Sequence, residues 1–146
     1  MLNALGWESR RSSSSPLVVE LEPARVAELA RYISTRLGAG AVRIVGDSTA
    51  TARRAGFTQG FPGFVANKSA IQQGIEVLVM GEDHEWETIA YAADAITAGR
   101  LKAVIVIGHV PSEQAGMEAV TKWLKTFITT MPVSFVPSRD PFVTVR

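Results

Sequence analysis

The sequence predicts an α/β protein with a mixed, largely parallel sheet flanked by helices. Residues 77–80 and 103–107 are apolar at every position, which is typical of central strands covered by helices on both faces. Each run is followed by a short polar segment and then by apolar residues at helical spacing. Strand–helix–strand units are almost always right-handed and make neighbouring strands parallel. We therefore expect strands near residues 76–80 and 103–107 to be parallel neighbours.

The first third of the chain predicts a polar arm, a strand and a helix. Residues 1–16 end in SSSSP and are expected to form an arm or linker outside the core, so that a single α/β domain covers residues 17–146. A strand is expected at residues 16–22. Pro23 is expected to open a helix, because proline favours the first helical turn, and Gly38 to end it. The apolar stripe of this helix consists of Val26, Leu29, Ala30 and Ile33.

The middle of the chain predicts two further strands and a short helix. Residues 41–47 have Val42 and Ile44 at alternate positions and end in a Gly-Asp turn signal, which predicts a strand. Residues 51–60 are expected to form another. A turn-rich loop, GFPGF at residues 60–64, then leads into a helix expected at residues 64–73.

The C-terminal third predicts two helices and a last strand. The helices are expected over residues 86–98 and 111–128, each directly after an apolar strand and its polar segment. The second helix is expected to face inward with Ala119, Val120, Trp123, Leu124 and Phe127. A strand at residues 133–136 and a tail at residues 138–146 complete the prediction.

Composition excludes several classes of function. The chain has 146 residues, a net charge of +1 and no cysteine. Without cysteine there are no disulfides and no thiolate metal sites, and the balanced charge gives no indication of nucleic acid or of an anionic membrane as a partner. No segment is apolar for long enough to span a bilayer, and the N-terminus lacks the apolar region of a signal peptide. We expect a cytoplasmic location.

Candidate functional residues follow the two apolar strands. Residues 81–85 are GEDHE and residues 108–113 are GHVPSE. If the strands are neighbours, about 4.8 Å apart, both segments lie at the sheet edge where ligands bind in open α/β proteins. His109 and Glu113 are candidate metal ligands there, because imidazole and carboxylate suit Zn, Fe, Mn or Ni. Glu82 is the residue of GEDHE most expected to point into the same crevice.

Simpler interpretations exist for the same residues. Pro111 places Glu113 in the first turn of a helix, where the helix dipole favours any carboxylate, and His109 can be a strand-end histidine bonded to a carbonyl. Two ligands also do not complete a catalytic zinc site, which uses three protein ligands and an open position. The spacing His-x-x-x-Glu therefore leaves both interpretations open.

The two motifs together resemble a known family. The stretch VLVMGEDHEW followed by VIVIGHVPSEQAGM is similar to the C-terminal half of the NIF-three-like family, whose members are known as dinuclear metal-centre hexameric proteins or homologues of type-two GTP cyclohydrolase. The resemblance covers roughly residues 17–137. It implies that His109 and Glu113 are metal ligands. It places Glu82 near the metals as a residue that supports the ligands, and His84, which has no secure family counterpart, is kept only as a further candidate for that role.

The resemblance also implies that the metal site in this chain is incomplete. The family's other ligands are two adjacent histidines and an aspartate from an N-terminal half of comparable size, and no His-His pair occurs here. The expectation is a truncated gene, a misassigned start, or a missing half that is supplied elsewhere. In an intact site two divalent ions (Zn, Mn, Fe or Ni) would be bound.

The sequence therefore leaves two alternative functions open. One is the C-terminal part of a metal-dependent hydrolase of unknown small-molecule substrate, in a homo-oligomer. The other is a non-enzymatic α/β scaffold for metal binding or oligomer formation, which the missing ligands favour for the chain as written. A chain with so few ligands is expected to bind divalent metal weakly and to hydrolyse nothing efficiently.

Overall fold

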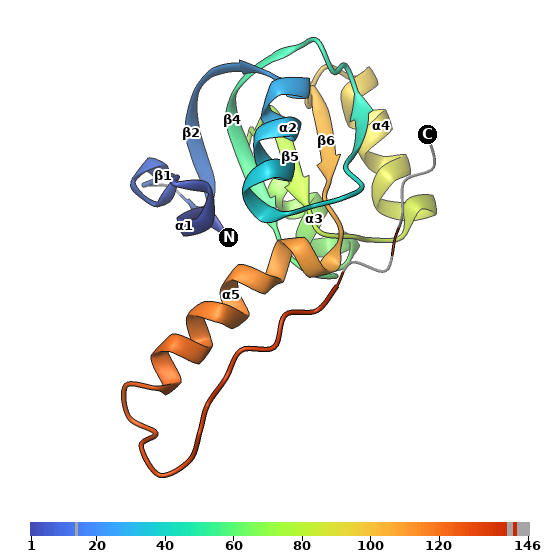
Figure 1. Ribbon diagram of the computed structural model, residues 1–146. Coiled ribbons are helices and arrows are strands. Elements are labelled where there is room, and N and C mark those ends of the chain that lie inside the picture. Colours follow the sequence, from blue (N-terminus) through green and yellow to red (C-terminus); the bar gives the residue numbers. More distant parts are fainter. Residues whose placement is uncertain (14, 140–141, 143–146) are drawn as a thin grey trace.

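The computed structural model describes residues 1–13, 15–139 and 142; most of the tail predicted at residues 138–146 lies outside this range. One six-stranded sheet and its flanking helices form the body of the molecule (Figure 1). In chain order the elements are α1 (Leu2–Leu5), the 3-10 helix η1 (Glu8–Arg10), β1 (Arg11–Ser12), β2 (Ser15–Arg25), α2 (Val26–Leu37), β3 (Arg43–Gly46), β4 (Thr51–Thr58), α3 (Phe64–Ile71), β5 (Val77–Met80), the π-helical turn η2 (Glu85–Ile89), α4 (Ala90–Thr97), β6 (Ala103–Val106) and α5 (His109–Leu124).

The sheet confirms the mixed α/β fold but is less parallel than expected. Its strand order is β1-β2-β4-β5-β6-β3. The central strands β4, β5 and β6 are parallel, which confirms the predicted parallel pairing of residues 76–80 and 103–107. The pairings β1–β2, β2–β4 and β3–β6 are antiparallel. Local apolar patterning marks a strand but does not choose its neighbour, so the antiparallel edges were not visible in the sequence.

Two apolar layers enclose the sheet. In β5, Val77 and Val79 contribute to the cluster beneath α1 and α2, whereas Leu78 and Met80 contribute to the cluster beneath α3 and α4. Every residue of β5 and β6 is buried, because both faces of a central strand are covered by helices. Among the described residues, none of the helices has both the length and the apolar character needed to cross a membrane.

The N-terminal segment belongs to the core, contrary to the expected polar arm at residues 1–16. Leu2, Leu5 and Trp7 are buried in the cluster that also contains the apolar face of α2, and β1 pairs with β2. The Trp7 ring stacks on Tyr32 at a centroid distance of 5.3 Å. A few large apolar side chains anchor the segment although its composition is polar.

The sequence predicted that Pro23 opens α2, and the structure shows that it does not. It lies near the end of β2, and α2 begins at Val26. The pairing of β2 with β4 shifts register between Glu20 and Ala24. A proline is tolerated at such an irregularity because no ladder hydrogen bond from its nitrogen is needed there.

The C-terminal region departs most from expectation. Most of the side chains expected to face inward from residues 111–128 do not: Val120, Trp123 and Phe127 are exposed by 43%, 62% and 55%. Ala119 is exposed as well, and Leu124 is partly buried. Figure 1 shows α5 projecting away from the sheet, with the following chain returning beside it. Residues 133–136 form no strand. The helix is amphipathic, as its apolar pattern predicts, but in the part of the chain that the structure describes these apolar side chains stay exposed.

Glu76 joins the amino ends of the parallel strands and gives a testable pH dependence. Its carboxylate accepts hydrogen bonds from the Arg53 backbone N–H at 2.6 Å and from Lys102 Nζ at 2.5 Å. Burial alone would raise the pKa of Glu76, but these hydrogen bonds together lower it below its ordinary value of 4.5. A carboxylate with a lowered folded-state pKa contributes stability above its unfolded pKa and loses it as the pH falls through the folded value.

We therefore expect the stability difference between the natural chain and Glu76→Gln to shrink as the pH falls below 4.5. The measurement is urea unfolding of both proteins over a pH series. A difference that stays constant with pH would show that the ionised carboxylate is not the stabilising form.

Candidate metal centre

Three loops meet at the carboxyl ends of the parallel strands. They follow β4, β5 and β6 and are joined by backbone hydrogen bonds from Glu82 N to Gly60 O at 2.9 Å and from Gly108 N to Gly81 O at 2.9 Å. The two predicted segments therefore do face one another. The third loop, which contains Gly60, was not part of the predicted site.

His109 lies between two carboxylates at this junction. Its Nδ1 is 2.8 Å from Glu82 Oε1 and its Nε2 is 3.1 Å from Glu113 Oε2. All three side chains are a little under half exposed, so the cluster is reachable from solvent. The structure thus brings together three of the four residues that the sequence singled out.

The two carboxylates favour the protonated imidazole. The hydrogen bond to Glu82 contributes most to raising the pKa of His109; burial opposes the shift, and the charges of Glu113 and Glu82 reinforce it. A metal ion needs an unprotonated ring nitrogen and has to compete with this proton. Metal affinity at this position would therefore increase as the pH rises through the pKa of His109.

The geometry fits one part of a metal site. In a tetrahedral site, ligand bonds of about 2.0–2.2 Å to nitrogen and oxygen place two neighbouring ligand atoms about 3.3–3.6 Å apart. The Nε2–Oε2 distance of 3.1 Å lies just below that range. Glu82 is bonded to the other ring nitrogen, Nδ1, as carboxylates commonly are to histidines that bind a metal. Within the described residues, however, no group of three or more His, Asp or Glu side chains is arranged to hold an ion. The residues present fit two ligands and their support.

Close backbone packing shapes the site. A Cβ atom on Gly60 would lie 2.2 Å from Glu113 Oε1, and one on Gly81 would lie 2.4 Å from the Gly60 carbonyl. Ser112, almost fully buried, accepts a hydrogen bond from Gly60 N at 2.9 Å and donates one to the His109 carbonyl at 2.7 Å. Only glycine at residues 60 and 81 lets the three loops approach this closely.

His84 lies apart from the His109 cluster. Its ring stacks on Trp86 and contacts the edge of Phe61, with centroid distances of 5.0 Å in both cases. Its Nδ1 is 3.8 Å from Glu87 Oε2. None of these contacts joins His84 to His109 or Glu113. The expected role of His84 in supporting the metal ligands therefore stays a prediction.

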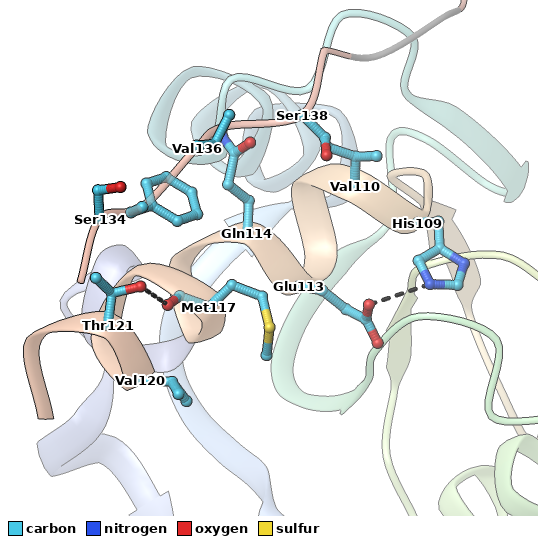
Figure 2. Close-up of a pocket in the computed structure, with 11 residues that line it drawn as sticks. His109, Val110, Glu113, Gln114, Met117, Val120, Thr121, Ser134, Val136 and Ser138 are labelled. Carbon is cyan, nitrogen blue, oxygen red and sulfur yellow. Dashed lines mark hydrogen bonds and ion pairs between the residues drawn. The ribbon is translucent and has the colours of Figure 1, made fainter. Parts of the chain in front are cut away.

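A groove of about 380 Å³ extends from the site (Figure 2). One side is formed by α5 and the other by residues between 134 and 138, and His109 and Glu113 lie at one end. Its size is within the range of small-molecule pockets. Gln114 also lines it, and the Oε1 atom of this residue is buried without a hydrogen-bond partner in the described structure.

Sequence reasoning did not assign the parts that Gly60, Ser112 and Asp83 play. Asp83 was expected only as a further acid of the crevice, whereas its side chain is fully buried. The signals were present but weak: Gly60 opens GFPGF, Ser112 is the small polar residue before Glu113, and Asp83 is the second acid of GEDHE. Each acts through a contact that is distant along the chain, such as the one between Gly60 and Ser112. No local pattern predicts such a contact.

Solved structures with the same architecture are known. Protein ybgI, described as of unknown function, has a TM-score of 0.72 and 25% identity over 97% of this chain and 55% of its own. A Bacillus cereus protein related to NIF3 has a TM-score of 0.69 and 22% identity, over 88% of this chain and 35% of its own. The Staphylococcus aureus protein SA1388 has a TM-score of 0.64 and 22% identity, over 88% and 36%.

The sequence comparison gives the same relationship. The chain spans roughly a third to just over half of the length of these solved structures. It has no match among curated protein sequences. Residues 3–141 match the model of the family described as Duf34/NIF3 (NGG1p interacting factor 3). Because that match covers nearly all of the chain, the protein belongs to the Duf34/NIF3 family.

Proposed function

We propose that this chain supplies His109 and Glu113 as ligands to a divalent metal centre, Zn, Mn, Fe or Ni, in a metal-dependent hydrolase of unknown substrate. The observation that carries the proposal is the 3.1 Å separation of His109 Nε2 and Glu113 Oε2, with His109 Nδ1 held by Glu82. A bound metal would stabilise the negative charge of an oxyanion and lower the pKa of a water molecule.

The residues have distinct parts in this proposal. Glu82 accepts a hydrogen bond from the Nδ1–H group of His109, so that the lone pair of Nε2 can bind the metal. Glu113 provides a negative charge one helical turn away, and the groove beside α5 gives a substrate access to both. Since a catalytic zinc ion uses three protein ligands, this chain alone holds too few for a pair of ions.

The test is calorimetric titration of the purified chain with Zn²⁺. We expect weak binding of one ion, lowered at least tenfold in His109→Ala and in Glu113→Gln, in line with the about 10–100-fold losses seen when support of a metal site is removed. Glu118→Gln is the matched control on the same helix, since Glu118 pairs with Lys122 instead. Phosphoester and nucleotide hydrolysis with added Mn²⁺ or Zn²⁺ should be negligible. Tight binding of two ions with rapid turnover would contradict the incomplete site.

A second candidate function is that of an oligomer-forming scaffold. The observation that favours it is the row of exposed apolar side chains on and after α5, which consists of Met117, Val120, Trp123, Phe127 and Met131. Large exposed apolar patches commonly mark interaction sites. We infer that the partner is another copy of this chain, in the cytoplasm, and this homo-oligomer is compatible with either function.

A further inference from the structure

The loop that carries Glu82 is held by a carboxylate buried beneath it. The Asp83 side chain is fully shielded from solvent. Its Oδ2 accepts hydrogen bonds from Asn67 Nδ2 at 2.6 Å and Thr88 Oγ1 at 2.5 Å, and its Oδ1 accepts one from the His84 backbone N–H at 2.8 Å. Every partner is a donor that matches a carboxylate, which only accepts when ionised.

The network reaches the strand that ends at the site. Asn67, which belongs to α3 and is fully buried, accepts a hydrogen bond from Thr58 Oγ1 at 2.7 Å. Thr58 is the last residue of β4, and Thr88 lies in the π-helical turn η2. Asp83 therefore joins its own loop to β4, α3 and η2 through groups that are almost completely buried. Such a satisfied polar network fixes a local geometry more strongly than isolated surface contacts do.

Adjacent residues of this loop point in opposite directions. Asp83 is turned into the fold, whereas the Glu82 side chain is 44% exposed and reaches His109 Nδ1. Anchoring the backbone at Asp83 consequently restricts where the Glu82 carboxylate can go. In a neutral His109 only one ring nitrogen carries a proton, and the shorter of its two carboxylate contacts is the one to Glu82.

We propose that Asp83 is a positioning residue: by anchoring the loop after β5 it holds Glu82 on His109 Nδ1 and so keeps the proton there, which leaves the Nε2 atom that faces Glu113 unprotonated. The value of this arrangement for metal binding rests on the function proposed above. The effect on His109 itself does not, because it exists in the metal-free protein.

Replacement of the buried carboxylate tests this directly. In Asp83→Asn the carboxylate is replaced by a neutral amide and one oxygen becomes an N–H donor, so the hydrogen bonds from Asn67, Thr88 and the His84 N–H lose their charge assistance and are weakened. In long-range ¹H–¹⁵N spectra of the metal-free natural chain, recorded where the imidazole is neutral, we expect the Nδ1–H form of His109. The chain has two histidines, and a His84→Gln spectrum assigns them.

Asp83→Asn is expected to move His109 toward the Nε2–H form, and Glu82→Ala to do the same. The double variant should show the same tautomer populations as Glu82→Ala alone, because Asp83 acts on His109 through Glu82. Asp94→Asn on the exposed side of α4 is the matched control and should leave the spectrum unchanged. Should Asp83→Asn fail to fold, Thr88→Val removes one donor to the same carboxylate and should give a smaller shift in the same direction.

A folded Asp83→Asn or Thr88→Val with the natural spectrum would overturn the proposal, as would an effect of Asp83→Asn that persists in full without Glu82. Zn²⁺ titration of the same proteins separates this from the proposed function. We expect affinity to fall about 10–100-fold in Asp83→Asn. A changed tautomer in a chain whose natural form binds no Zn²⁺ would refute the metal centre alone. Zn²⁺ binding that depends on His109 but is unaffected by Asp83→Asn would refute the positioning role alone.

Discussion

Gly60→Ala is expected to abolish Zn²⁺ binding at His109 and to lower stability. A Cβ atom at this residue would lie 2.2 Å from Glu113 Oε1 and 3.3 Å from His109 Nε2, so the Glu113 carboxylate has to leave the position in which it faces His109. The backbone φ of Gly60 is +58°, and a side chain in this left-handed region costs about 1–2 kcal/mol. Zn²⁺ calorimetry and urea unfolding of the variant measure the two effects.

The neighbouring Gly63 provides a control that separates strain from contact. It has a φ of +81°, but a Cβ atom there would have no neighbour within 4 Å. Gly63→Ala should lower stability at least as much, because the ψ of 164° at Gly63 lies in a region that is essentially restricted to glycine. Zn²⁺ binding should be retained. If both variants bind Zn²⁺ like the natural chain, the close approach of the Gly60 backbone to Glu113 is not needed for metal binding.

Trp123→Gln is expected to weaken self-association by at least tenfold. Trp123 is 62% exposed on α5 and contacts the edge of the Phe127 ring at a centroid distance of 4.8 Å. Tryptophans in the centre of an interface commonly contribute about 2 kcal/mol or more, and 1.4 kcal/mol already corresponds to a tenfold change in affinity. Sedimentation equilibrium over a range of concentrations gives the association constant.

Lys122→Gln is the matched control for this substitution. Lys122 is the adjacent residue, is 74% exposed and pairs with Glu118 on the same helix. The same new side chain at this position should leave the association constant within about twofold, as expected for a residue at a polar rim. A natural chain that stays monomeric at every concentration would contradict the scaffold, whatever the variants do.

The sequence predicted the centre of the fold and the principal residues of the site. Residues 77–80 and 103–107 are apolar throughout, and this alone indicates central parallel strands, because only strands covered on both faces need it. His109, Glu113 and Glu82 come after those strands in the sequence. Because neighbouring parallel strands end at the same edge of the sheet, the three residues are expected at one edge. Their convergence, with His109 between the two carboxylates, required no information beyond the order of the strands.

The tertiary structure alone decided what surrounds those residues. The N-terminal segment packs through Leu2, Leu5 and Trp7, and the apolar side chains of α5 stay exposed. Gly60 reaches Glu113 across more than fifty residues of sequence, and Asp83 reaches Asn67 across sixteen. Periodicity records how a segment distributes its own side chains, and it is therefore a local property. Strand order, loop contacts and buried polar networks depend on which distant segments meet, and that is determined by the packing of the whole chain.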